Sequence, residues 1–125
     1  MSEQQPDKIL YIGTCAAENP EKAAMPFVMG MAAIAMDMEA VICLQGNGVY
    51  VAQKGYAEKM PPPGGFPPIS KLLPDFLELG GRLLVCVPCI KDRNISEDEL
   101  VSGAQTTAAG ALNILATESK AVFVY

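Results

Sequence analysis

The sequence predicts a three-layer α/β/α sandwich built on a mostly parallel sheet of four or five strands. Short, nearly continuous apolar runs are typical of strands that are buried on both faces. These runs alternate along the chain with segments of helical composition, an order that favours a parallel sheet with helices on both faces. The chain has 125 residues. Since domains commonly contain about 100–200 residues, we expect a single domain over residues 1–125.

The first third of the chain predicts two strands joined by a long helix. Residues 8–14 form an apolar run that ends in Gly-Thr, which indicates a buried strand. Asn19-Pro20 is typical of a helix start and predicts a helix over 21–37. This helix is apolar nearly all round, so one face of a sheet cannot cover it and we expect a partner subunit. Residues 39–44 form the second apolar run, and the strand-helix-strand order implies a parallel pair.

The middle of the chain is dominated by glycine and proline. Gly46-Asn47-Gly48 indicates a turn directly after the second strand, and residues 49–60 are expected to form a short helix. Residues 61–68 hold five of the ten prolines, so we expect an ordered, non-helical loop there, with a lid as one of its roles. Residues 69–79 have apolar side chains at helical spacing, and Gly80-Gly81 is a typical helix stop.

The last third predicts two further strands and a helix. Residues 82–87 form a buried strand that leads into the charged stretch 91–94. Ser96 begins a short helical turn in the style of a capping box. The alanine-rich segment 105–119 is expected to be helical, and residues 121–125 to close the sheet.

Composition and charge exclude several function classes. Nine basic residues against fourteen acidic ones give a net charge of −5, which repels a phosphate backbone and disfavours direct binding of nucleic acid. The sequence contains no histidine, which excludes Ser-His-Asp triads, Cys-His dyads and histidine-ligated metal sites. Only 18% of the residues are charged whereas 50% are hydrophobic, and this imbalance favours self-association.

The apolar stretches are too short to predict a membrane span. The most apolar uncharged stretch, residues 23–36, has fourteen residues, whereas a helix that crosses a bilayer needs about 20. The N-terminal residues are polar and acidic, unlike the basic start and apolar core of a signal peptide. We therefore expect a cytoplasmic protein.

Three predicted loops meet at one edge of the sheet. In a parallel sheet the loops that follow the strands gather at the carboxyl ends, where ligands bind in doubly wound folds. Cys43 lies inside its strand and is expected in the core. The residues expected at the carboxyl edge are Cys15, Gly46, Asn47, Cys86 and Cys89.

The sequence Cys86-Val-Pro-Cys89 is the strongest candidate for chemistry. Two thiols at this spacing allow one to attack while the other resolves a disulfide or accepts a sulfur atom. Lys91 and Arg93 are close enough in sequence to favour the thiolate in the absence of histidine. A thioredoxin-like pair would open a helix, whereas Cys86 is expected in the strand and residues 91–94 continue a helix poorly. A dithiol redox pair and two inert, packed thiols remain as alternatives.

Neither a metal nor a cofactor is expected. A site built from Cys15, Cys86 and Cys89 lacks a fourth ligand unless Cys43 or another subunit supplies it. The glycines of the 46–48 turn lack the further glycines or the lysine of a nucleotide-binding loop.

Several short motifs follow one another in a distinctive order across nearly the whole chain. They are Gly13-Thr14 with Asn19-Pro20, Gly46-Asn47-Gly48, Gly65-Phe66-Pro67-Pro68, Val85-Cys86-Val87 followed by Arg93-Asn94-Ile95, and Leu100-Val101-x-Gly103-Ala104. In this combination the sequence resembles the DsrE/DsrF-like family of sulfur oxidation and sulfur relay, which includes sulfurtransferases of the thiouridine tRNA pathway. The three-layer fold of that family agrees with the sheet predicted above.

The resemblance implies a function and a role for one cysteine. Family members carry sulfur as a persulfide on the cysteine that corresponds to Cys86, and Arg93 and Lys91 would then stabilise the thiolate. Relatives form homotrimers, hexamers or heterohexamers, and they exchange sulfur with donor and acceptor proteins. We therefore expect a small sulfur carrier or sulfurtransferase subunit. Cys89 resolves Cys86, shares the persulfide or has no chemical role.

Two alternatives to sulfur transfer remain at this point. The first is a non-catalytic oligomeric module that binds a ligand or partner at its proline-lined edge. The second is a dithiol redox protein that uses Cys86 and Cys89. Several branches of the family have no demonstrated activity, so whether this chain is an enzyme is left open by the sequence.

Overall fold

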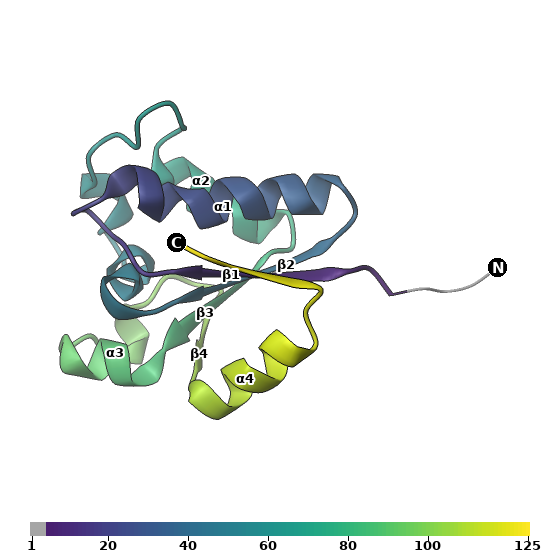
Figure 1. The fold of residues 1–125 in the computed structure, drawn as a ribbon. Helices are drawn as coiled ribbons and strands as arrows, with labels where there is room; N and C mark the ends of the chain where they lie inside the picture. Colours follow the sequence, from purple (N-terminus) through teal and green to yellow (C-terminus); the bar gives the residue numbers. More distant parts are fainter. Residues whose placement is uncertain (1–4) are drawn as a thin grey trace.

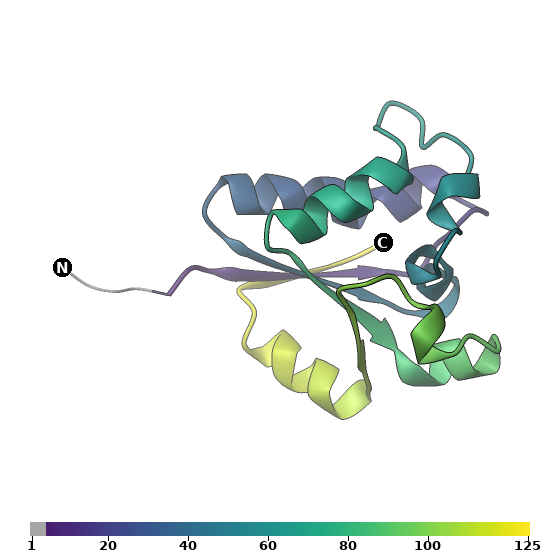
Figure 2. The same ribbon diagram turned by 180° about the vertical axis from the view of Figure 1, so that it is seen from behind.

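The computed structural model describes residues 5–125, which form a five-stranded parallel sheet in the order β4-β3-β2-β1-β5. Figures 1 and 2 show α1 and α2 on one face of the sheet and α4 on the other, with α3 beside the carboxyl end of β3. The predicted α/β fold and parallel sheet are confirmed. The strands are β1 (Lys8–Gly13), β2 (Glu39–Leu44), β3 (Arg82–Cys86), β4 (Ala104–Thr107) and β5 (Ala121–Val124). The helices are α1 (Pro20–Ala35), α2 (Ile69–Glu78), α3 (Val87–Asp92) and α4 (Ala109–Thr117).

Helix α1 begins and packs as its sequence dictates. The side chain of Asn19 caps the helix by accepting a hydrogen bond from the backbone N–H of Lys22 at 3.2 Å, and Pro20 occupies the first turn. A β-carbon at Gly30 would lie 2.8 Å from the ring of Phe76, so glycine allows α1 and α2 to approach closely. These contacts hold the two helices as one layer over the sheet.

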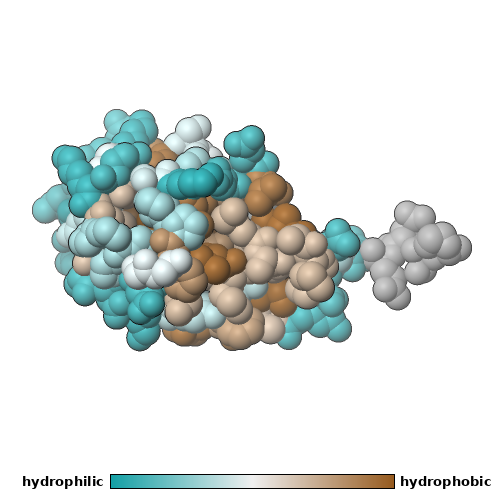
Figure 3. Space-filling view, turned by 90° about the horizontal axis from the view of Figure 1, so that it is seen from above, coloured by the Kyte–Doolittle hydropathy of each residue, from teal (hydrophilic) through white to brown (hydrophobic). Residues whose placement is uncertain are grey.

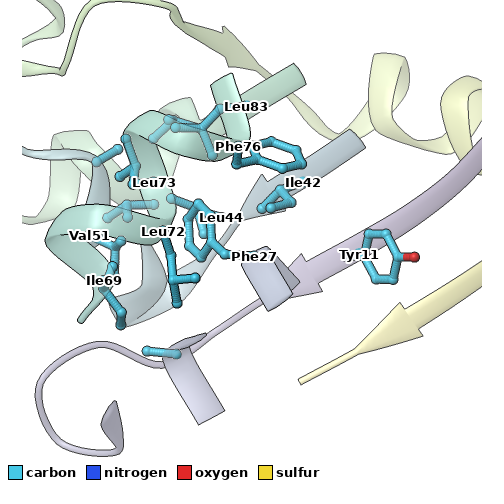
Figure 4. Close-up of a cluster of buried hydrophobic side chains, with 14 of the residues drawn as sticks. Tyr11, Phe27, Ile42, Leu44, Val51, Ile69, Leu72, Leu73, Phe76 and Leu83 are labelled. Atoms are coloured by element: carbon cyan, nitrogen blue, oxygen red, sulfur yellow. The ribbon is translucent and has the colours of Figure 1, made fainter. Parts of the chain in front are cut away.

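The hydrophobic core is divided unequally between the two faces of the sheet. The larger cluster lies under α1 and α2, where Phe27 and Phe76 meet edge to face with ring centroids 5.8 Å apart (Figure 4). The smaller cluster lies under α4 and contains Leu10, Val41, Cys43, Leu84 and Leu115. Cys43 is fully buried there, as its position inside a strand predicted.

The prediction of a continuous helix over 105–119 was wrong in its first part. Residues Ala104–Thr107 form β4, which pairs with β3 from Leu83 to Cys86, and α4 begins only at Ala109. The two consecutive threonines are β-branched and suit a strand, and pairing along the edge of β3 outweighs the helical propensity of the neighbouring alanines. The sheet therefore has five strands, and the start of α4 is brought to its carboxyl edge.

Two shorter elements also differ from their predictions. Residues 49–60 do not form one helix but two 3₁₀ segments, η1 (Gly46–Ala52) and η2 (Ala57–Lys59). Between them Gln53 is extended and pairs with Leu100, and Gly55 has a left-handed φ of 84°. The strand predicted over 82–87 ends at Cys86, and the next residues form α3, with a proline in the first turn where its missing N–H is not needed.

The surface carries a patch of exposed apolar side chains. Figure 3, which looks onto the α1 side, shows hydrophobic residues gathered in the centre and right of centre, with hydrophilic residues over the left and a smaller hydrophilic group at the right. Within residues 5–125, no helix is both long and apolar enough to cross a bilayer. Among the described residues, exposed large hydrophobic side chains lie on several elements: Met36 follows α1, Leu79 follows α2, Ile114 lies on α4, and Val122, Phe123 and Val124 lie on β5.

Candidate functional site

The two cysteines of the Cys86-Val-Pro-Cys89 motif lie side by side at the carboxyl end of β3. Cys86 is the last residue of β3 and Cys89 lies in the first turn of α3. The thiol of Cys89 donates to Cys86 Sγ, and the two sulfur atoms are 2.9 Å apart. This separation is less than 1 Å longer than a disulfide bond of about 2.05 Å. Both side chains are partly exposed, so the pair is close enough to react and accessible to a second molecule.

The 3₁₀ segment η1 presents a backbone donor to this pair. The N–H of Gly46 donates to Cys89 Sγ at 3.3 Å. Gly46 has a φ of 54°, in the left-handed region that favours glycine. Gly48 holds the segment in place, because a β-carbon there would overlap the carbonyl oxygen of Gly13 and lie 2.9 Å from its carbonyl carbon. Both glycines of the predicted turn therefore bring η1 against the cysteine pair.

Arg93 connects the end of α3 to η1. Its Nη2 and Nε donate to Asn47 Oδ1 at 3.0 and 3.3 Å, and its Nη1 donates to the carbonyl oxygen of Cys89 at 3.1 Å. The guanidinium also lies 5.8 Å from the centroid of the Tyr50 ring, within the range of a cation–π contact. Arg93 and Asn47 thus fix the backbone of Cys89.

Two residues predicted for the site lie apart from the cysteine pair. Lys91 is exposed on α3, and within residues 5–125 its side chain makes no hydrogen bond or ion pair. The contact recorded for the Cys15 sulfur is with Thr14 Oγ1 at 3.9 Å. The part of the chain that the structure describes contains no group of three or more metal-ligating side chains, so Cys15, Cys86 and Cys89 are not brought together as ligands.

Opposing effects act on the pKa of the Cys86 thiol. Burial raises the pKa of Cys86 above its ordinary value, and the hydrogen bond from the Cys89 thiol raises it further. The backbone N–H of Cys89 and the charge of Arg93 lower this pKa, but they do not outweigh burial. Arg93 therefore favours the thiolate of Cys86, in the predicted sense, whereas burial makes the net shift of the Cys86 pKa upward.

The third thiol of this region is kept neutral. Burial raises the pKa of Cys43 to about 12, and the neighbouring Cys86 and Cys89 thiols raise it in the same direction. A thiol in this state is a poor nucleophile at neutral pH, since the thiolate is the reactive form. Cys43 is also fully buried, whereas Cys86 and Cys89 beside it are partly exposed.

A pocket of about 90 Å³ lies beside Cys86. A single water molecule needs only about 10–15 Å³ of such space, so the pocket has room for one additional sulfur atom on Cys86. Ala108 and Ala109 of the lining are exposed to solvent, which leaves the pocket accessible. The other lining residues are Cys43, Gln45, Pro88, Thr107 and Leu112.

The wall of this pocket at the junction of β4 and α4 was not predicted from the sequence. Thr107, Ala108 and Leu112 reach the site because β4 inserts beside β3 and turns into α4, whereas a helix over 105–119 was expected. The consecutive threonines at 106 and 107 were the signal of a strand. A larger cavity of about 690 Å³ between β4 and α4 shares Thr107 but contains none of the cysteines.

Three relatives are similar in sequence to this chain. The uncharacterized protein MJ0989 of Methanocaldococcus jannaschii is 32% identical over 118 residues, which cover 94% of this chain and 99% of the relative. Another protein of that organism, MJ0760, is 31% identical over 103 residues, but the match covers 82% of this chain and only 37% of the relative. MK0008 of Methanopyrus kandleri is 28% identical over 103 residues, 80% of this chain and 81% of the relative.

Solved structures and a family pattern complete the comparison. The ychN protein of E. coli superposes with a TM-score of 0.79 at 17% identity, covering 95% of this chain and 99% of its own. MTH1491 of Methanobacterium thermoautotrophicum, a protein of unknown function, gives a TM-score of 0.68 at 14% identity, covering 96% and 99%. These two structures support the fold. The pattern of the DsrE/DsrF-like family matches residues 7–125, and the chain therefore belongs to the DsrE/DsrF-like family.

Proposed function

We propose that this protein is a sulfur carrier, or the sulfur-carrying subunit of a sulfurtransferase, that holds a persulfide on Cys86. The observation that supports this proposal most directly is the 90 Å³ pocket beside Cys86, which has room for one more sulfur atom and opens to solvent at α4. Membership of a family associated with sulfur relay supports the same reading.

The chemistry requires a proton acceptor but no histidine. Cys86 attacks the outer sulfur of a donor persulfide R–S–SH, which forms Cys86–S–SH and releases R–SH. The thiol proton of Cys86 ends on the departing R–S⁻, so atoms and charge balance. Cys89, 2.9 Å away, shares a hydrogen bond with Cys86, and Arg93 favours negative charge on it. An acceptor thiol then attacks the outer sulfur, which the open pocket leaves accessible.

Sulfur loading tests the proposal directly. The reduced full-length protein is incubated with inorganic polysulfide, freed of excess reagent and measured by intact-protein mass spectrometry. In a spectrum recorded directly after loading, we expect a mass gain of one sulfur in the wild type and in the control Cys15→Ser, which removes a thiol outside the site. Cys86→Ser should lose this gain. Sulfur loading that persists in Cys86→Ser would assign the carrier role to another cysteine and refute the proposal.

We further infer that the protein forms a homo-oligomer, a trimer or hexamer, and exchanges sulfur with donor and acceptor proteins. Strand β5 is an edge of the described sheet, and it exposes Val122, Phe123 and Val124 together. An open edge with apolar side chains is a surface that proteins commonly cover by association. Light scattering coupled to size-exclusion chromatography measures the state, and a monomer at micromolar concentration would contradict the inference.

A further inference from the structure

We propose that Cys89 is a resolving thiol that releases sulfur from Cys86 as hydrogen sulfide and leaves a Cys86–Cys89 disulfide. This inference rests on the proposed persulfide at Cys86 and adds the fate of its outer sulfur. The protein would then be a source of sulfide, as well as a carrier that passes sulfur to another thiol.

The position of Cys89 selects the atom that it attacks. Its Sγ lies 2.9 Å from Cys86 Sγ, the atom that becomes the inner sulfur of the persulfide. Attack on the inner sulfur forms a disulfide and expels the outer sulfur, whereas attack on the outer sulfur would only move the persulfide. The existing contact therefore favours release over transfer to Cys89.

The pocket beside Cys86 provides a place for the leaving atom. Cys86 lines this pocket, together with Pro88, Thr107 and Leu112, but Cys89 does not. If the added sulfur of the persulfide occupies this pocket, the side of Cys86 Sγ that faces Cys89 stays open to attack. Thiol exchange requires the attacking sulfur and the leaving sulfur to lie on different sides of the atom under attack, and this arrangement meets that requirement.

Contacts outside the pair hold Cys89 in place when Cys86 is modified. The N–H of Gly46 donates to its sulfur at 3.3 Å, and Arg93 Nη1 donates to its carbonyl oxygen at 3.1 Å. Neither contact involves Cys86, so both can persist when Cys86 carries an extra sulfur. Cys89 therefore keeps its place beside Cys86 after sulfur is loaded.

The reaction balances without an external oxidant. Cys86–S–SH and Cys89–SH give Cys86–S–S–Cys89 and H₂S: the bond between inner and outer sulfur breaks, and a bond between the two cysteine sulfurs forms. The outer sulfur takes two electrons from the cysteine pair and leaves with its own hydrogen and the proton of Cys89. A dithiol reductant then returns the disulfide to two thiols for the next cycle.

The test compares single cysteine variants of the full-length chain. Wild type, Cys89→Ser and the control Cys15→Ser are loaded with inorganic polysulfide, freed of excess reagent and incubated without reductant while free sulfide and protein mass are followed. We expect wild type and Cys15→Ser to release one sulfide per chain and to end two hydrogens lighter than the reduced protein. Cys89→Ser should load normally, keep its extra sulfur and release sulfide at least about tenfold more slowly.

The outcomes separate this inference from the proposed function. If Cys89→Ser loads and releases sulfide at the wild-type rate, the resolving role is refuted and sulfur carriage on Cys86 stands. If neither the wild type nor Cys89→Ser ever gains sulfur, the proposed function itself fails. A wild-type persulfide that stays intact, while an added oxidant readily forms the Cys86–Cys89 disulfide, would show an ordinary dithiol pair and overturn the inference.

Discussion

The substitution Gly48→Ala tests whether the packing of η1 against β1 builds the site. A β-carbon at this position overlaps the carbonyl oxygen of Gly13, lies 2.9 Å from the carbonyl carbon of Gly13 and 3.3 Å from the Cα of Thr14. All three atoms belong to the backbone, so no side chain can rotate to make space. The segment η1 must therefore move away from the end of β1.

The expected magnitude follows from two opposing effects. Forcing an extra carbon into a packed site costs about 1–3 kcal/mol. Alanine also restricts the unfolded chain more than glycine does, which returns about 0.4–1 kcal/mol. We expect Gly48→Ala to lower the free energy of unfolding by about 1–2 kcal/mol, and to lower Tm by about 3–10 °C for a domain of this size.

Urea denaturation and thermal unfolding measure this effect, and Gly65→Ala is the matched control. Gly65 has no heavy atom within 4 Å of the added β-carbon, and its φ lies outside the left-handed region, so its substitution should change stability by less than about 0.5 kcal/mol. Gly48→Ala should also slow sulfide release, because a displaced η1 withdraws the Gly46 N–H from Cys89. Equal stability of the two variants would refute the packing argument.

Three further predictions concern the pocket and its polar frame. Asn47→Ala removes the acceptor of two Arg93 hydrogen bonds. We expect this variant to release sulfide several-fold more slowly while its sulfur loading, measured by mass, stays complete. An unchanged rate of sulfide release would contradict a positioning role for Asn47. Ala108→Leu narrows the pocket beside Cys86 and should reduce the yield of persulfide. The control Ala111→Leu changes an exposed residue of α4 outside this pocket and should load as much sulfur as the wild type. Equal loading by both variants would place the outer sulfur elsewhere. Because burial raises the pKa of Cys43 from 9.0 to about 12, the folded chain retains a proton that the unfolded chain loses. The contribution of the Cys43 thiol to the free energy of unfolding is complete below pH 9 and is lost as the pH rises from about 9 towards 12. In urea denaturation, the free energy of unfolding of Cys43→Ala should therefore fall less steeply over that pH range than that of the wild type. Equal slopes for the two proteins would refute this assignment.

The three inner strands of the sheet could be predicted from the sequence because each one has a recognisable local pattern. Strands β1, β2 and β3 are short apolar runs buried on both faces, and such runs need no knowledge of their neighbours to be recognised. Strand β4 is different, since Gln105, Thr106 and Thr107 carry no apolar run and precede a segment rich in alanine. Its conformation comes from pairing with β3, a long-range contact that local propensity does not report.

The candidate site shows the same division between local and long-range information. The rule that loops gather at the carboxyl ends of parallel strands predicted that Cys15, Gly46, Asn47, Cys86 and Cys89 would share one edge. In the structure, Gly46 and Cys86 each contact Cys89, and Arg93 links Asn47 to the backbone of Cys89. The contact recorded for the Cys15 sulfur is with Thr14 instead. The net rise of the Cys86 pKa could not be predicted from neighbouring charges, because it depends on burial. The pocket wall formed by Thr107, Ala108 and Leu112 could not be predicted either, because its position depends on strand β4.

The two halves of the site depend on the fold to different degrees. Cys86 and Cys89 are three residues apart, so even an unfolded chain keeps these thiols at a high effective concentration. The pocket combines residues from the end of β2, the start of α3 and the start of α4, segments that meet only when the sheet is assembled. Unfolding therefore abolishes the compartment for an extra sulfur while sparing the capacity to form a disulfide. The proposed persulfide thus depends on the assembled sheet, whereas disulfide formation by the two thiols does not.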